Sequence, residues 1–237
     1  CMLFSRIQKN LGSWIVIASI VGAFLSAVTS LQRVIADGGK PIHYWMGNWQ
    51  PPLGIEFVID PISGALAVLI TFISLLGAIY SLPFVKEEGW LHIGGYYTLY
   101  GLMTVGMCGM VITGDVFNLY VFLEVMSLSG YGLIAIGGKK SMLAAFRYLL
   151  IGTIGASLYL LGVGYMYALT GTLNMADMAV RAAEFLNYPL FALALACFVV
   201  GFGIANNLAR SFTPYAVNVF FCDFFNNVVI SCAKTKT

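Results

Sequence analysis

The feature that most constrains this chain is a series of long stretches without charged residues. Five stretches contain no Asp, Glu, Lys or Arg, and a sixth is interrupted only by Glu124. They are residues 10–32, 61–85, 89–114, 148–176, 185–209 and, for the interrupted one, 116–138. A helix of about 20 apolar residues crosses the hydrocarbon core of a bilayer. Because backbone polar groups cannot remain unpaired in lipid, these stretches are predicted to be transmembrane helices.

The composition excludes several classes of protein. Only 9% of the residues are charged and 60% are hydrophobic, whereas soluble domains carry about 25% charged residues. A soluble enzyme, a disordered tail and a nucleic-acid-binding module are therefore excluded. The five cysteines are scattered without a CxxC pair, and the chain has neither a P-loop nor a hydrolase or metalloprotease motif. We therefore expect no metal and no cofactor in this chain, and the lipid bilayer rather than nucleic acid as its partner.

The sequence predicts an all-α polytopic bundle of about six spans. These are placed near 11–32, 62–84, 91–113, 116–137, 145–168 and 187–209. The link over residues 36–60 is predicted to be a long loop, and the mildly amphipathic segment 171–184 to lie along the membrane surface. Seven Lys and Arg residues collect on one side of the membrane and three on the other, which predicts a cytoplasmic start for the chain.

Glu124 is the main candidate for a functional residue. It lies about eight residues into its span, roughly 12 Å from the start of the helix. Ionisable residues inside a membrane are costly and usually face a cavity or a partner. A carboxyl group poised between burial and a nearby cation can bind and release a proton. The alternative is a protonated or paired glutamate that only joins helices. Tyr131, seven residues further on, is expected to share its helix face.

Other polar residues have more ordinary interpretations. Arg147 opens the fifth span, and taken alone it is an arginine that reaches to the membrane interface. Asp115 is predicted to cap the helix that begins at Val116. Glu56 and Asp60 are expected to be a solvated pair in a loop. Small residues of the fifth span predict close helix packing, and they are Gly152, Gly155, Ala156, Gly162 and Gly164.

Three long motifs resemble those of a known family. They are the runs Thr113 to Met126, Gly162 to Asp177, and Met46 to Ile55 with Val58 to Asp60. The first resembles the signature helix of the large membrane subunit of Mrp-type cation/proton antiporters, MrpD, and the others resemble two further hallmarks of that subunit. The same fold serves in antiporter-like subunits of complex I and of membrane-bound hydrogenases. The resemblance covers residues 12–204.

The resemblance implies a proton-translocating subunit of a multisubunit Na⁺/H⁺ antiporter, in a prokaryotic inner membrane. H⁺, Na⁺ and other membrane subunits would be its partners, and it would not itself be an enzyme. Glu124 matches the family's essential glutamate. Arg147 stands where the family usually has a lysine, and would be an electrostatic modulator of Glu124. Ala205 stands where a key lysine of the family is expected.

The alternatives left open concern the complex and the completeness of the chain. One is an ion-pumping subunit of complex I or of an energy-converting hydrogenase, and another is an inactive truncated remnant. The likeness to the family stops after Ile204. The chain is therefore expected to consist of a partial antiporter domain at 1–209, resembling the first half of an antiporter-like subunit, and an atypical tail at 210–237.

Overall fold

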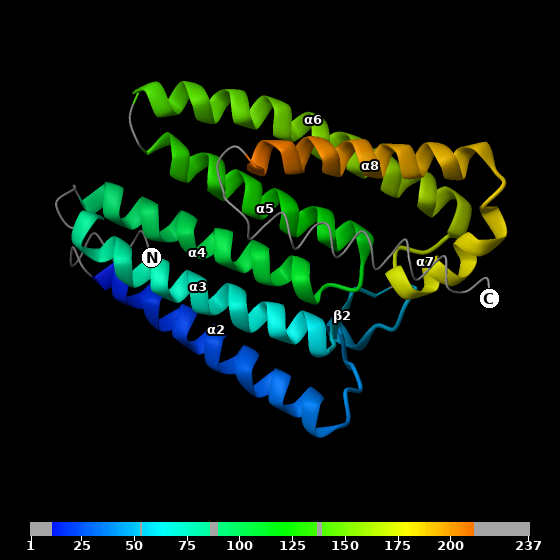
Figure 1. Ribbon diagram of the computed structural model, residues 1–237, viewed down its shortest axis with the longest axis horizontal. Coiled ribbons are helices and arrows are strands. Elements are labelled where there is room, and N and C mark those ends of the chain that lie inside the picture. The colour runs from blue at the N-terminus through cyan, green and yellow to red at the C-terminus, as the bar shows by residue number, and fades with distance from the viewer. Residues whose placement is uncertain (1–10, 53, 86–89, 137–138, 211–237) are drawn as a thin grey trace. The chain divides into compact units, whose positions relative to one another are not determined.

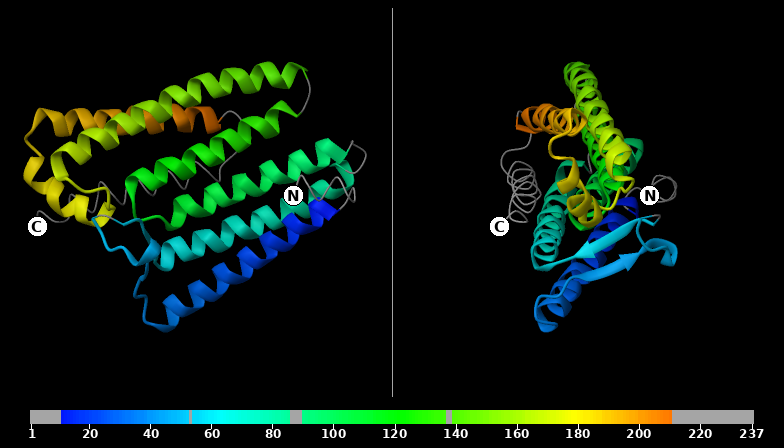
Figure 2. Two further views of the ribbon diagram at one scale, coloured as in Figure 1. Left: turned by 180° about the vertical axis from the view of Figure 1, so that it is seen from behind. Right: turned by 90° about the vertical axis from the view of Figure 1, so that its right-hand side faces the viewer.

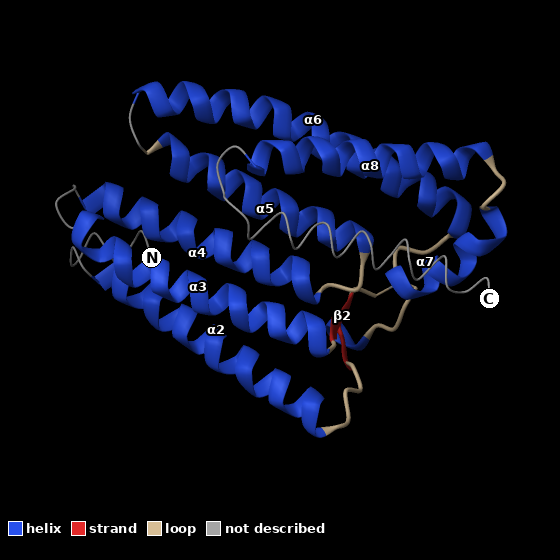
Figure 3. Cartoon of the chain, in the orientation of Figure 1, coloured by secondary structure: helices blue, strands red, loops and turns tan. Residues whose placement is uncertain are grey.

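The computed structural model describes residues 11–52, 54–85, 90–136 and 139–210. The described part is built almost entirely of helices (Figures 1 and 3). Their bounds are α2 Leu11–Ala36, α3 Pro61–Val85, α4 Trp90–Ile112, α5 Val116–Ala135, α6 Lys139–Thr170, α7 Met175–Ala182 and α8 Pro189–Arg210. Of the predicted tail at 210–237, Arg210 ends α8 and residues 211–237 lie outside the described residues.

The predicted spans are confirmed as helices. Five are long and apolar enough to cross a membrane, namely Gly12–Ala36, Pro61–Leu82, Ile93–Ile112, Val116–Ala135 and Ser141–Thr170. The sixth, α8, contains a shorter apolar stretch at Pro189–Ile204 among the described residues. The largest difference from the predicted bounds is the start of α6, which begins at Lys139 rather than near residue 145.

The link between α2 and α3 is not a plain loop, and the prediction was wrong here. It contains β1 (Ile42–Trp45) and β2 (Glu56–Ile59), which pair in a two-stranded sheet (Figure 2, right), and a short 3-10 helix, η1 (Met46–Asn48), between them. The Met46 N–H donates to the Ile55 carbonyl over 3.0 Å. Both strands are runs rich in aromatic and β-branched residues, which favour a pleated strand.

The chain divides into two compact units. The first comprises Cys1–Tyr44, Phe57–Thr113 and Val121–Phe146. Helices α2, α3 and α4 pack against one another within it. Their shared core consists of Val16, Ile17, Ile20, Ala78, Ile93 and Tyr97.

The second unit comprises Trp45–Glu56, Gly114–Tyr120 and Arg147–Thr237. Its central side chain is Tyr159 of α6, which is 3% exposed. The ring of Tyr159 lies 4.9 Å from that of Phe202 and 5.1 Å from that of Phe198, both on α8. Its hydroxyl donates a hydrogen bond to the carbonyl of Val116, the first residue of α5 (3.1 Å). This single tyrosine thus ties α8 and the start of α5 to α6.

Glycines allow α6 and α8 to approach closely. A Cβ at Gly155 would lie 3.0 Å from the Gly201 carbonyl oxygen, and one at Gly162 would lie 3.1 Å from the Ala194 carbonyl oxygen. The predicted close packing is therefore confirmed at these two positions. A Cβ at Gly164 would meet nothing within 4 Å, so that glycine is not needed for this approach.

Candidate functional site

Glu124 lies on α5, two turns from the start of the helix and about 12 Å along its axis. The face of α5 around Phe122 and Met126 packs against α4, where Gly109 and Gly106 leave room for it. A helix turns by about 100° per residue, so Glu124 lies on the side opposite this contact. The side chain is half-buried. The glutamate is thus held on a helix whose other face is fixed by close packing.

Hydroxyl groups follow Glu124 along α5. Tyr131 is 9% exposed, interacts electrostatically with Glu124 and is hydrogen-bonded to Ser127. This agrees with the predicted shared face. Ser129 instead donates to the carbonyl of Val125 in its own helix over 2.6 Å. The structure thus places the Tyr131 hydroxyl near the glutamate and the Ser127 hydroxyl beside that of Tyr131.

Arg147 lies on α6 and is exposed. It belongs to the second unit, whereas Glu124 belongs to the first. Among the residues that the structure describes, none forms a salt bridge with Arg147. The role of Arg147 as a modulator of Glu124 therefore stays a prediction.

The three motifs that carry the family resemblance meet in the second unit. The Gly114 N–H donates to the Glu56 carbonyl (2.8 Å), and the Met175 N–H donates to the Gly114 carbonyl (2.9 Å). The Val116 N–H donates to the Leu173 carbonyl, also over 2.9 Å. The hairpin, the turn before α5 and the segment before α7 are thereby joined through their backbones. We call the residues that form these three hydrogen bonds the junction. They are Glu56, Gly114, Val116, Leu173 and Met175.

Glu56 is buried at the junction, with 8% of its surface exposed. Its carboxylate accepts hydrogen bonds from Asn174 Nδ2 (2.5 Å) and from Trp45 Nε1 (3.2 Å). The expectation of a solvated Glu56 is therefore wrong, because the residue begins strand β2 and faces these donors. A signal was present in the sequence: Glu56 opens a run of four residues with strand character after a Pro-Pro-Leu-Gly turn.

Aspartate side chains cap the first turns of two helices. Asp115 Oδ1 accepts from the Asn118 N–H over 2.7 Å, which confirms the predicted cap of α5. Burial raises the pKa of the Asp115 carboxyl above its usual value, while hydrogen bonds from the Asn118 and Phe117 backbone oppose that shift. Asp60 accepts from the Ser63 N–H over 2.6 Å and caps α3. Asp60 thus has a local role at a helix start.

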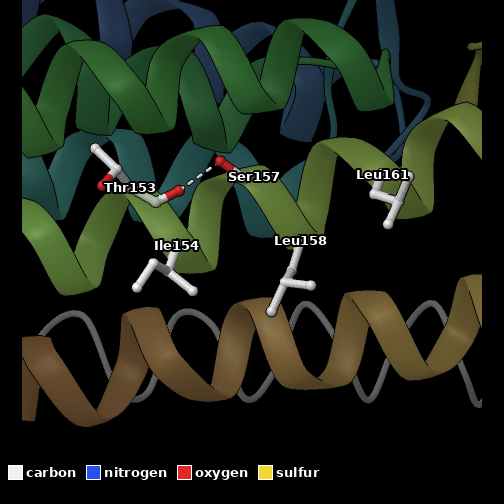
Figure 4. A pocket seen from close by; sticks show the side chains of 5 residues that line it. All are labelled: Thr153, Ile154, Ser157, Leu158 and Leu161. Atoms are coloured by element: carbon white, nitrogen blue, oxygen red, sulfur yellow. Dashed lines mark hydrogen bonds between the residues drawn. The ribbon is translucent and has the colours of Figure 1, made fainter.

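Other features of the described residues do not add to the site. No group of three or more His, Cys, Asp or Glu side chains in the described part could hold a metal ion. An open depression of about 400 Å³ runs along α6, and in Figure 4 Ile154 and Leu158 point from it toward α8. Its lining is Thr153, Ile154, Ser157, Leu158 and Leu161, which includes none of the candidate residues.

Comparisons with known proteins show that this chain is similar to membrane subunits of several complexes. Residues 113–209 match the family described as NADH:quinone oxidoreductase/Mrp antiporter, TM. The N subunit of the NADH-quinone oxidoreductase of Desulforudis audaxviator is 43% identical over 227 residues, with 92% of this chain and 45% of the relative covered. The D subunit of the Na(+)/H(+) antiporter of Alkalihalophilus pseudofirmus is 31% identical over 191 residues, with 80% and 38% covered.

Solved structures give the same fold. The membrane-bound sulfane sulfur reductase, an archaeal respiratory membrane complex, matches with a TM-score of 0.79 and 30% identity, covering 93% of this chain and 46% of that one. The Mrp complex from a Dietzia species matches with a TM-score of 0.72 and 24% identity, covering 86% and 39%. The chain spans less than half the length of each of these proteins.

Proposed function

We propose that the chain is part of a proton-translocating subunit of a multisubunit membrane complex, because residues 113–209 match the family described as NADH:quinone oxidoreductase/Mrp antiporter, TM. The observation that carries this proposal is Glu124. It is the acidic residue within the candidate spans that the structure describes, and it is half-buried on a helix fixed by close packing. We place the subunit in a prokaryotic cell membrane, with the first residues of this chain on the cytoplasmic side.

In this proposal Glu124 takes up a proton from one side of the membrane and releases it to the other. Tyr131 and Ser127 supply hydroxyl groups beside the carboxyl that can take part in hydrogen bonds with it or with water. Arg147 changes the proton affinity of Glu124 through its positive charge. Directional transport needs such a control, because moving a nearby charge switches a carboxylate between proton binding and release.

The coupling that we propose is exchange of H⁺ against a monovalent cation, namely Na⁺. Its support is the set of relatives named as the D subunits of Na⁺/H⁺ antiporters. A second candidate is coupling to electron transfer in a partner arm of the complex. It is favoured by the 43% identical relative, which is named as an oxidoreductase subunit, and by the match to the sulfane sulfur reductase complex.

A sodium gradient separates the two couplings. In sealed vesicles that contain the native complex, an imposed Na⁺ gradient is expected to drive H⁺ movement without any electron donor, because an antiporter needs only the two ions. A pH-sensitive dye in the vesicle lumen measures this. Control vesicles lacking the complex give the leak. If H⁺ moves only after an electron donor and a quinone are added, coupling to electron transfer replaces the Na⁺ proposal.

Replacement of Arg147 tests its role. Arg147→Ala is expected to move the pH optimum of transport to higher pH by about one unit, since a cation near a carboxyl favours loss of its proton. Some transport should remain, because Glu124 is intact. Arg147→Lys retains the charge and is the matched control. An unchanged pH profile in Arg147→Ala at normal activity would mean that Arg147 only reaches to the membrane interface.

A further inference from the structure

Among the residues that the structure describes, the proposed mechanism uses neither of two buried acidic residues, namely Asp115, which caps α5, and Glu56. We propose that Glu56 and Asn174 form a positioning pair that holds the start of α5 in place and thereby sets where Glu124 lies. The proposal rests on the proposed function of Glu124, since it concerns the same helix. Neither residue would touch the transported proton.

The pair joins two segments that are far apart in the chain. Glu56 begins β2, and Asn174 precedes α7, 118 residues later. The hydrogen bond from Asn174 Nδ2 to the Glu56 carboxylate is 2.5 Å long, and both residues are at most 8% exposed. Hydrogen bonds to ionised groups are about twice as strong as those between neutral groups. A contact of this kind, shielded from water, fixes the two segments against each other.

The backbone of the same two segments holds the turn that leads into α5. The Glu56 carbonyl accepts from the Gly114 N–H, and the Gly114 carbonyl accepts from the Met175 N–H. The residue before Asn174, Leu173, accepts through its carbonyl from the Val116 N–H. The turn before α5 is therefore hydrogen-bonded to the segment of Glu56 and to the segment of Asn174, and the side-chain pair joins these two segments.

The position of this turn is transmitted along α5. Glu124 follows Val116 by two helical turns in one continuous helix. A helix is stiff over this length, so a shift or rotation of its first residue moves Glu124 as well. Misplacing a reacting group by 1 Å can lower a rate by about 10²-fold. We therefore expect the loss of the pair to reduce transport without removing the glutamate.

The Asn174 side chain forms two kinds of hydrogen bond, so a substitution can change its bond to Glu56 while keeping its cap on α7. Its side-chain oxygen accepts from the Ala176 and Asp177 N–H groups and caps α7, while its Nδ2 group binds Glu56. Asn174→Asp keeps the cap, because aspartate is an equally good N-cap residue, but it sets a carboxylate against Glu56. Glu56→Gln leaves one acceptor oxygen for two donors, so its NH2 group faces either Asn174 Nδ2 or Trp45 Nε1. The double variant reverses donor and acceptor and restores the hydrogen bond, while Trp45 still finds an acceptor.

The experiment compares the native complex, the two single variants and the double variant at matched protein amounts. We expect each single variant to lower the maximal transport rate about tenfold and to shift the pH of half-maximal transport. We expect the double variant to return to within about twofold of the native rate with the native pH profile. A purely structural role would change the yield of complex but not its pH profile.

Hydrogen exchange supplies a second readout that does not depend on transport. The Gly114 and Met175 amide protons should exchange faster in each single variant and at the native rate in the double variant. Native exchange in both single variants, or a double variant as impaired as the singles, would overturn the pair. Altered exchange with unchanged transport would overturn its influence on Glu124. If Glu124→Gln transports normally, the proposed function fails, while the exchange data still decide whether the pair anchors the turn.

Discussion

Glu124→Gln is expected to abolish proton-coupled transport while the complex still folds and assembles. Glutamine has nearly the same volume as glutamate and still forms hydrogen bonds, but it cannot take up and release a proton at physiological pH. No second acidic side chain lies within the candidate spans of the described chain to replace it. Groups that transfer protons typically contribute 10²- to 10⁴-fold to a rate, so we expect a loss of about 10²-fold or more.

The measurement is H⁺ movement into vesicles at matched amounts of assembled complex. Glu184→Gln is the matched control, because it makes the same chemical change at an exposed residue of the short helix η2 (Ala183–Phe185), outside the candidate spans. The control should transport at the native rate. If Glu124→Gln transports as well as Glu184→Gln does, Glu124 is a packing residue and the proposed mechanism loses its main support.

The helices could be predicted from the sequence because the bilayer imposes a simple rule. An apolar stretch of about 20 residues that crosses lipid satisfies its backbone groups by forming a helix, and the predicted spans agree with α2 to α6 to within six residues. The cap at Asp115 and the close packing at Gly155 were predictable for a similar reason. Both follow from local chemistry, since an aspartate before an apolar run caps a helix and small residues permit close approach.

The junction could not be predicted in the same way, because its residues are distant in the chain. Glu56 lies 118 residues before Asn174, and no local pattern indicates that the two side chains meet. The loop assignment for residues 36–60 had a different cause. That segment contains several glycine and proline residues, which indicate a loop. Its two strands of four residues are too short to show a clear alternation of polar and apolar side chains. A solvated Glu56 was the natural expectation for a loop.

The resemblance to a known family could indicate Glu124 as a functional residue, but it could not indicate which contacts hold α5 in place. In the structure one face of α5 is fixed by α4 and its first turn by the junction. These contacts hold α5 and therefore keep Glu124, the proposed proton-binding residue, in a constant position. They also identify the places where a small change far from Glu124 should have a large effect.

Gly106→Ala is expected to destabilise the protein strongly for a change of one methyl group. A Cβ at Gly106 of α4 would lie 2.8 Å from the backbone nitrogen of Met126 and 2.9 Å from its Cβ. Backbone atoms cannot move aside as the end of a flexible side chain can, so α4 and α5 would have to separate. Overpacking of this kind typically costs about 1–3 kcal/mol. Because Met126 lies two residues beyond Glu124, transport should fall too.

Gly95→Ala on the same helix is the matched control. A Cβ at Gly95 would meet nothing within 4 Å, and alanine is favoured over glycine inside a helix by about 0.5–1 kcal/mol. Thermal unfolding of the purified complex in detergent should therefore show a lower melting temperature for Gly106→Ala and an equal or higher one for Gly95→Ala. Equal melting temperatures for the two variants would show that α4 and α5 can separate at little cost. In that case close packing against α4 would not be what holds Glu124 in position.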